Sequence, residues 1–156
     1  MEDYKVPTVQ VSADVLLTDG QVLRGTVFMP ALSAVQAGPM PPEEWINSPV
    51  AFFPFRPSGG GPGLLLNKGQ VLAFTVTGDH SEEEPAEVSE LPVHHLVIEA
   101  GGHRFEGTVI VDMPLNQRRV VDYINRPEAF LLLRGADRNH LIQKSEISRV
   151  VEIREA

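Results

Sequence analysis

An internal repeat constrains the fold of this chain more than any other feature of its sequence. Three blocks of the first half align, in the same order, with three blocks of the second half: 15–29 with 97–111, 45–52 with 123–130, and 65–71 with 141–147. The offset between the halves drifts slowly, from 82 through 78 to 76 residues. Because three collinear matches rarely arise by chance, we infer a tandem duplication and expect two copies of one supersecondary unit.

Each copy begins with a pattern typical of a β-hairpin. Apolar residues alternate with mainly polar ones over residues 9–17, as in a half-buried strand. Asp-Gly at residues 19–20 then predicts a type I′ turn, and Gly-Gly at residues 101–102 supplies the turn in the second copy. Gly25 and Gly107 fall inside the returning strands, where glycine is costly unless a bend or a close backbone approach requires it.

A short helix is expected next in both copies, followed by three more strands. Residues 41–47 combine proline and acids with an Asn ending, and residues 120–125 place Val120, Val121 and Ile124 at helical spacing. Asn116 could cap the second helix. The strands predicted after the helix are 51–55, 64–67 and 71–76 in the first copy, and 129–133, 140–144 and 147–153 in the second. The fold class is therefore mainly β.

The charge distribution separates the two copies. Residues 1–92 hold 4 Lys and Arg against 12 Asp and Glu, whereas residues 93–156 hold 9 against 9, so all of the net charge of −8 lies in the first part. Residues 77–92 contain five glutamates and two prolines, a composition typical of a solvated linker. We expect a first repeat over residues 8–76, an acidic linker over 77–92 and a second repeat over 93–156.

The closing segment of the second copy resembles a known family. Residues 143–151, a polar-Lys-x-x-Ile-x-x-Val pattern preceded by the apolar Ile142, resemble the second motif of the Hfq family, and residues 97–112 resemble its first motif. The order of elements is similar to the Sm-like fold, the five-stranded small barrel of Sm, Lsm and Hfq proteins. The resemblance implies two tandem Sm-like small barrels, each with a short helix between its second and third strands.

This resemblance does not carry the family's RNA site with it. Hfq-type chaperones place their helix before the first strand and a histidine directly after the lysine equivalent to Lys144. Here Ser145 follows that lysine, and Gly69 follows Lys68. The helix, the Ile-Asn-x-Pro turn and the Lys-x-x-Ile ending also resemble an uncharacterised bacterial domain family, which implies no activity.

Several classes of function are disfavoured by the residues that are missing. With no cysteine, the chain has no disulfide, thiolate metal site or thiol nucleophile. His94 and His95 are adjacent, so on a regular strand they point to opposite faces and cannot both bind one ion. The sequence holds no nucleophile elbow, P-loop or dinucleotide turn. We expect no enzyme, no metal, no cofactor and no membrane segment, and a cytoplasmic location.

Cations repeated in both copies are the candidate binding residues. Matched pairs occur at Arg56/Arg134 and Lys68/Lys144, and the second copy adds further arginines. The full candidate set is Arg56, Lys68, Arg118, Arg119, Arg126, Arg134 and Lys144. The alternative is structural, with each matched arginine pairing with the helix acid, Glu44 or Asp122, of its own copy.

The predicted function is that of a non-enzymatic protein-interaction or assembly module, with a protein partner or self-association through exposed strand edges. The alternative is an RNA-binding protein that uses the cationic face of the second repeat. Overall acidity disfavours RNA, because affinity for nucleic acids is largely built from cation contacts to phosphates.

Overall fold

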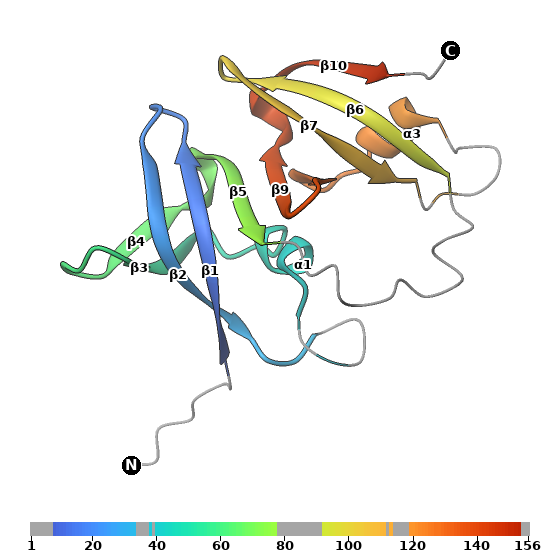
Figure 1. Cartoon of the computed structure of the whole chain (residues 1–156). Coiled ribbons are helices and arrows are strands. Elements are labelled where there is room, and N and C mark those ends of the chain that lie inside the picture. Colours follow the sequence, from blue (N-terminus) through green and yellow to red (C-terminus); the bar gives the residue numbers. More distant parts are fainter. Residues whose placement is uncertain are drawn as a thin grey trace. The chain divides into compact units, whose positions relative to one another are not determined.

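A computed structural model describes residues 8–33, 38, 40–77, 92–111, 113 and 119–153 of the chain. The fold is mainly β, as predicted, and the chain divides into two compact units, Met1–Val76 and Thr77–Ala156 (Figure 1). The predicted acidic linker lies outside the described residues except for Thr77 and Pro92. No helix among the described residues is long and apolar enough to cross a membrane.

The first unit is an antiparallel sheet with a short helix inserted after its hairpin. Its elements are β1 (Thr8–Leu17), β2 (Val22–Pro30), α1 (Pro42–Ile46), β3 (Phe52–Pro57), β4 (Leu64–Asn67), the 3₁₀ turn η1 (Lys68–Gln70) and β5 (Val71–Thr77). The strands pair in the order β5-β1-β2-β3-β4. Trp45 in α1 packs on Phe74 in β5 and on Phe53 in β3, with ring centroids 5.3 and 5.0 Å apart.

The second unit has the same order of elements. They are β6 (Val93–Ala100), β7 (His103–Ile110), α3 (Val120–Ile124), β8 (Phe130–Arg134), β9 (Arg138–Gln143), the 3₁₀ turn η3 (Lys144–Glu146) and β10 (Ile147–Ile153). The strands pair in the order β10-β6-β7-β8-β9. Its core is mainly aliphatic, with Leu96, Ile98, Leu133, Leu141 and Ile142 fully buried.

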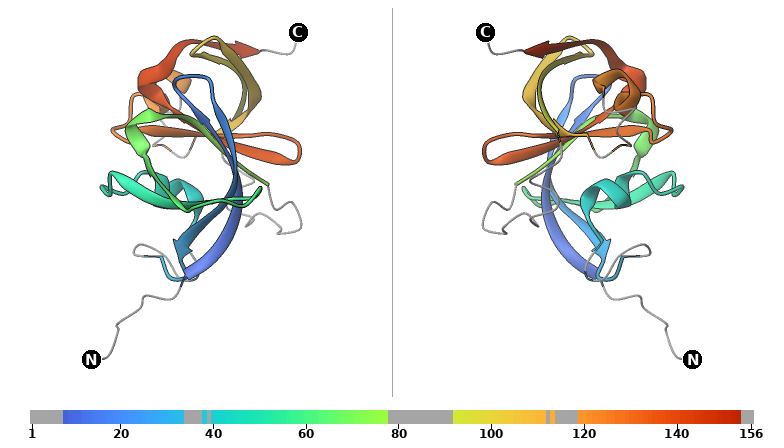
Figure 2. Two further views of the ribbon diagram at one scale, coloured as in Figure 1. Left: turned by 90° about the vertical axis from the view of Figure 1, so that its left-hand side faces the viewer. Right: turned by 90° about the vertical axis from the view of Figure 1, so that its right-hand side faces the viewer.

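Both sheets must be strongly bent, because their outermost strands are joined by a connection of only three residues. Three residues of η1 link β4 to β5, and three residues of η3 link β9 to β10. In a flat five-stranded sheet the outer strands would lie about 19 Å apart, at about 4.8 Å per neighbouring pair. A 3₁₀ turn of this length rises only about 8 Å. The curvature of the two hairpins is visible in Figure 2.

The glycines inside the returning strands allow the third strand of each unit to approach closely. A Cβ atom on Gly25 would collide with the backbone of Arg56 in β3, with its carbonyl carbon only 2.9 Å away. A Cβ atom on Gly107 would collide with the backbone of Arg134 in β8, with its carbonyl carbon 3.0 Å away. Neither glycine has a positive φ, so the close approach rather than the backbone conformation explains both residues.

The two hairpin turns differ, and the first is not the predicted type I′ turn. Gly20 is the one residue of that turn with a positive φ, and Leu17 exchanges backbone hydrogen bonds with Gly20 and Gln21. This is a three-residue loop with glycine in the left-handed position. In the second hairpin Gly101 and Gly102 both have positive φ between the paired Ala100 and His103, as a two-residue type I′ turn requires.

Because the first turn is one residue longer than the second, the residues of β1 match residues of β6 that lie one position further along the chain than the sequence alignment placed them. Val15 pairs with Phe74, and it is Ile98 rather than Val97 that pairs with Val150, the residue aligned with Phe74. The strand registers therefore match residue 15 with residue 98. The alignment by sequence, which placed residue 15 against residue 97, is wrong on this strand.

Candidate functional site

The two lysines of the candidate set direct their ammonium groups to the end of the helix in their own unit. The Lys68 ammonium donates to the Trp45 carbonyl and to the Ser48 hydroxyl, both at 3.0 Å, and to the Ser48 carbonyl at 3.3 Å. The Lys144 ammonium donates to the Arg126 carbonyl at 2.9 Å. Because Ser48 and Arg126 are aligned residues, the two lysines hold the same turn in both units. These contacts favour a structural role for the two lysines.

Backbone hydrogen bonds fix the same junction in both units. The Lys68 amide donates to the Ala51 carbonyl, and the Lys144 amide donates to the Ala129 carbonyl, each at 2.8 Å. Lys68 is only 7% exposed, and this burial lowers the pKa of its ammonium group below the ordinary value. A cation so enclosed has little surface to offer a partner.

Two arginines near α3 are also engaged within the second unit. The Arg119 guanidinium makes a bidentate pair with Asp122 at 2.9 and 3.1 Å, a contact that raises the pKa of Arg119 and lowers that of Asp122. The Arg126 guanidinium carbon lies 4.0 Å from the centroid of the Tyr123 ring, and its Nε donates to the Tyr123 carbonyl at 3.2 Å. Arg119 remains exposed to solvent, whereas Arg126 is half-buried.

The matched arginines on the third strands occupy corresponding positions. Arg56 pairs in register with Thr26, and Arg134 pairs with Thr108, next to the two glycines in the returning strands. The Arg56 guanidinium carbon lies 5.0 Å from the Phe28 ring centroid, while Asp122, the helix acid expected to pair with Arg134, binds Arg119. Arg118 lies outside the described residues.

The described candidate cations occupy three kinds of position within their own units. The lysines lie at helix ends, Arg56 and Arg134 lie on third strands, and Arg119 and Arg126 flank α3. Among the described residues no group of three His, Cys, Asp or Glu side chains could hold a metal ion.

Each unit has two outermost strands in its own sheet, β4 and β5 in the first and β9 and β10 in the second, and among the described residues β4 and β10 are the two that expose large apolar side chains. Within that part of the chain, β4 pairs with β3 alone and β10 pairs with β6 alone. Leu65 on β4 is 72% exposed, and Val151 on β10 is 47% exposed. Each edge therefore combines backbone groups that pair on one side only with an apolar side chain in solvent.

One polar pair in the second unit was not singled out as a site by the sequence. The Nδ1 nitrogen of His94 on β6 lies 2.9 Å from the Glu152 carboxylate on β10. These residues are 58 positions apart, and no motif connects them. Only the strand register brings them together, since Leu96 pairs with Glu152 and His94 lies two residues away on the same face.

Comparisons of the chain with protein-family models, with curated proteins and with solved structures found no match.

Proposed function

We propose that this chain is a non-enzymatic protein-interaction or assembly module built from two Sm-like units, and that the open edges of β4 and β10 are its working surfaces. The observation that carries the proposal is that, among the outermost strands of the two units, β4 and β10 combine backbone groups that pair on one side only with exposed large apolar side chains. Soluble proteins usually protect such edges with lysines, prolines or a covering segment, because an open edge recruits further strands. β4 contains no charged residue and no proline, and β10 contains no lysine or proline but carries Arg149 and Glu152.

The Sm-like part of the proposal has two supports. Both units pair their strands with the fifth beside the first and the fourth at the opposite edge. Both place a short helix between the second and third strands and a 3₁₀ turn between the fourth and fifth. We propose that the bend required by that turn brings each sheet to a small, incompletely closed barrel.

Assembly through these edges would extend a sheet from one molecule to the next. β4 and β10 differ in sequence and belong to different units, so a contact between them is heterologous and can repeat from copy to copy. Main-chain hydrogen bonds would supply much of the affinity, and the exposed Leu65 and Val151 would add apolar contact.

The contacts of the cations do not favour the RNA alternative. A nucleic-acid surface needs accessible cations in an array that follows the phosphates. Lys68 is buried, Lys144 donates to a carbonyl, and Arg126 stacks on an aromatic ring. Arg119 is exposed, but its charge is balanced by Asp122.

Sedimentation velocity over a range of protein concentrations tests the proposal. We expect the wild-type sedimentation coefficient to rise with concentration, and Leu65→Lys on β4 or Val151→Lys on β10 to suppress that rise. Val22→Lys is the matched control, because Val22 is 53% exposed but lies on β2, which has strand neighbours on both sides. A wild-type chain that stays monomeric, or edge variants that associate like the wild type, would contradict assembly through these edges. Saturable RNA binding that weakens steeply with salt would favour the alternative function.

A further inference from the structure

A shallow cleft of about 310 Å³ lies on one face of strands β2, β3 and β4 in the first unit. Side chains alternate along β3, so Phe53 and Phe55 are buried in the core while Pro54 and Arg56 are exposed on the opposite face. The cleft opens on this exposed face, and its lining includes Phe28, Pro54, Arg56, Gly63 and Leu65.

Arg56 is the charged residue among those that line the cleft. Its guanidinium carbon lies 5.0 Å from the centroid of the Phe28 ring, so the ring holds the cation while the in-plane N–H groups remain as donors. Arg24, the other arginine of the first unit, lies 3.9 Å from the Asp14 carboxylate. Among the described residues no carboxylate pairs with Arg56. Because a guanidinium stays charged, the group that complements Arg56 is an anion from outside the described structure.

The strands that carry the cleft contain no acidic residue to oppose such an anion. Residues 22–30 form β2, and residues 52–67 run from the start of β3 to the end of β4. These two ranges hold Arg24 and Arg56 and neither Asp nor Glu. The excess acidity of the first part of the chain therefore lies outside the strands that form the cleft, and their own charge favours an acidic ligand.

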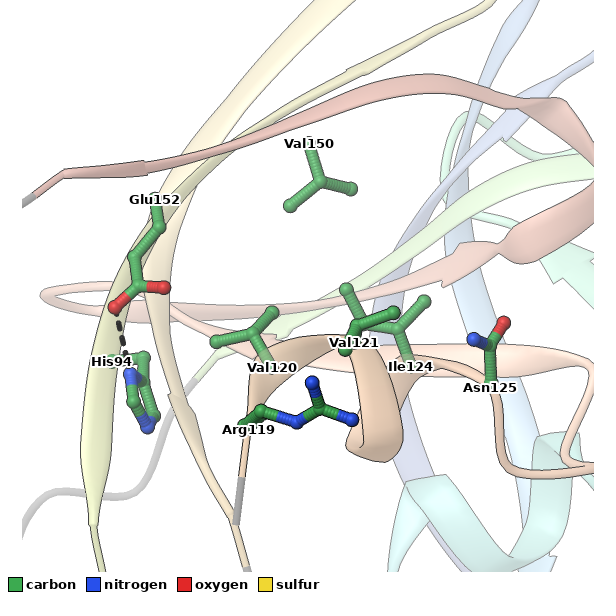
Figure 3. Close-up of a pocket in the computed structure, with 8 residues that line it drawn as sticks. All are labelled: His94, Arg119, Val120, Val121, Ile124, Asn125, Val150 and Glu152. Carbon is green, nitrogen blue, oxygen red and sulfur yellow. Dashed lines mark hydrogen bonds and ion pairs between the residues drawn. The ribbon is translucent and has the colours of Figure 1, made fainter. Parts of the chain in front are cut away.

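The apolar side chains around the cleft are exposed, although their counterparts in the second unit are buried. Strand register matches Leu65 with Leu141 and Phe52 with Phe130. Leu65 is 72% exposed and Phe52 is 54% exposed, whereas Leu141 and Phe130 are buried. The second unit is hollowed elsewhere, and Figure 3 shows side chains of α3 and β10 around a groove there. Clustered apolar side chains left in solvent are typical of a surface that binds another protein.

The backbone of Leu65 is directed to the open edge of β4. The Lys68 amide donates to the Ala51 carbonyl, so residues 51 and 68 form a hydrogen-bonded pair of the β3–β4 ladder. Such pairs alternate with non-hydrogen-bonded ones, which makes Pro54–Leu65, three positions further along, a non-hydrogen-bonded pair. Proline suits this position because it has no N–H. The N–H and C=O groups of Leu65 therefore point away from β3, where an added strand can bond to both.

We propose that β4 and the cleft beside it bind an extended, acidic segment of a partner protein, which adds a strand along β4. The residue of that segment opposite Leu65 would be apolar and would pack on Leu65 and Pro54. An Asp or Glu two residues away would lie on the same face and pair with Arg56. This inference rests on β4 as a proposed working surface and specifies the chemistry of the segment that binds there.

Gly63 leaves the way open between the added strand and Arg56. A Cβ atom on Gly63 would have only the Phe55 carbonyl oxygen within 4 Å, at 3.9 Å. The added strand would lie two strand spacings from β3, about 9.6 Å. Extended arginine and glutamate side chains together span that distance, and no side chain of residue 63 stands between them.

Selection from a phage-displayed library of random seven-residue peptides, with the full chain as bait, tests the proposal. We expect enrichment of peptides that carry an apolar residue and an acidic residue two positions apart. A fluorescein-labelled synthetic copy of the most enriched peptide is then titrated by fluorescence anisotropy. Arg56→Gln should weaken binding by about fivefold or more, because the peptide carboxylate loses a charged donor. Arg24→Gln is the matched control on β2 and should bind like the wild type.

Three further comparisons separate a direct contact from a change in folding. Arg56→Glu should bind a peptide with lysine in place of its acid more tightly than the original peptide, a reversal that loss of structure does not produce. Gly63→Val fills the gap beside Arg56 and should weaken binding by about tenfold. Gly59→Val should bind like the wild type, because a Cβ atom there meets nothing within 4 Å. N-methylation of single peptide amides should weaken binding by about tenfold at alternate positions, since a strand presents every second amide to its neighbour.

The possible outcomes separate this proposal from the proposed function. No enrichment, equal binding by Arg56→Gln and Arg24→Gln, or no reversal with Arg56→Glu overturns the proposal even if the chain self-associates. Binding of a mixed RNA pool through Arg56, with no peptide enriched, also overturns it. Peptide binding with the expected pattern in a chain that stays monomeric supports the proposal and contradicts only self-association.

Discussion

Replacing Lys68 with methionine tests whether the repeated lysines are structural or exposed to partners. Methionine keeps an unbranched side chain of similar length but removes the ammonium group, which donates to the Trp45 carbonyl and to both oxygens of Ser48. The ammonium also lies 5.2 Å from the centroid of the Trp45 ring. We predict that Lys68→Met destabilises the first unit by loosening the turn after α1.

The size of the effect follows from these contacts. Hydrogen bonds from a charged donor contribute about 1.5–3 kcal/mol, and a carbonyl left without its donor in a buried place costs a further amount of about 1–3 kcal/mol. The gain from no longer burying a charge opposes both effects, and the lowered pKa of Lys68 shows that this opposing contribution is present. We expect the free energy of unfolding to fall by about 2–3 kcal/mol.

Urea denaturation followed by tryptophan fluorescence measures this change directly. Trp45 is the only tryptophan of the chain, and its own carbonyl accepts the lysine bond. The midpoint should fall by about 1–2 M urea with an unchanged slope. Arg24→Met is the control, because Arg24 is an exposed cation of the same unit and its loss should change stability by less than about 0.5 kcal/mol. If Lys68→Met is as stable as this control, the lysine does not hold the turn, and its interpretation as a binding residue regains support.

Three further predictions concern other parts of the two units. Lys144→Met should lower the free energy of unfolding by about 1–2 kcal/mol, less than Lys68→Met because Lys144 is only partly buried; a larger loss in urea denaturation would contradict this ranking. Gly25→Ala and Gly107→Ala should each lower the free energy of unfolding by about 1–3 kcal/mol, because the added Cβ collides with the third strand. Gly59→Ala is the control, because its added Cβ meets nothing within 4 Å, and it should leave stability unchanged. Equal melting temperatures for all three variants would refute the close approach as the reason for these glycines. Burial is the main cause, and repulsion from Arg138 the second, of a pKa for His140 that is lowered from the ordinary value of 6.5. The unfolded chain therefore binds a proton at His140 more readily than the folded chain does, and the free energy of unfolding should fall as the pH drops below about 6.5. His140→Phe, which keeps a ring beside Phe105, should weaken that dependence in melts between pH 7 and 5, and an unchanged pH profile would show that His140 does not contribute to it.

The sequence predicted the strands well because their signals are local. Alternation over residues 9–17 matches β1, and the apolar runs at 51–55 and 129–133 overlap β3 and β8. The mid-strand glycines were attributed to a bend or a close backbone approach, and the backbones of Arg56 and Arg134 make that approach. A close approach between two backbones can be predicted from the sequence because it requires glycine at one position.

The first turn was predicted wrongly because the Asp-Gly pair fits two geometries. A type I′ turn needs positive φ at both central residues, whereas the observed loop needs it only at Gly20. The choice depends on how the strands pair, which a dipeptide does not determine. The resulting shift of one residue also concealed the match between Val11 and His94.

The roles of the cations could not be predicted from their recurrence alone. A residue kept in two copies can serve a shared partner or a shared packing need, and Lys68 and Lys144 both donate to the turn after the helix. A groove between α3 and β10 presents the reverse case, because two residues that line it, Val150 and Glu152, differ from their counterparts in the first unit, Phe74 and Val76. Val150 is smaller than Phe74, but the sequence does not show that either residue faces a helix. The strand register and the packing of the helix are needed to recognise that this difference in volume leaves a groove.

Hydrogen–deuterium exchange of the wild-type chain at low and high concentration tests the central claim, that the open strand edges are the working surfaces. If copies associate through these edges, amides of Leu64–Asn67 and Ile147–Ile153 should exchange more slowly at high concentration, because an added strand hydrogen-bonds the outward-facing groups. Amides of β1 and β7, which have strand neighbours on both sides, should not change. New protection confined to other segments, or none at the two edges while the chain associates, would contradict the account.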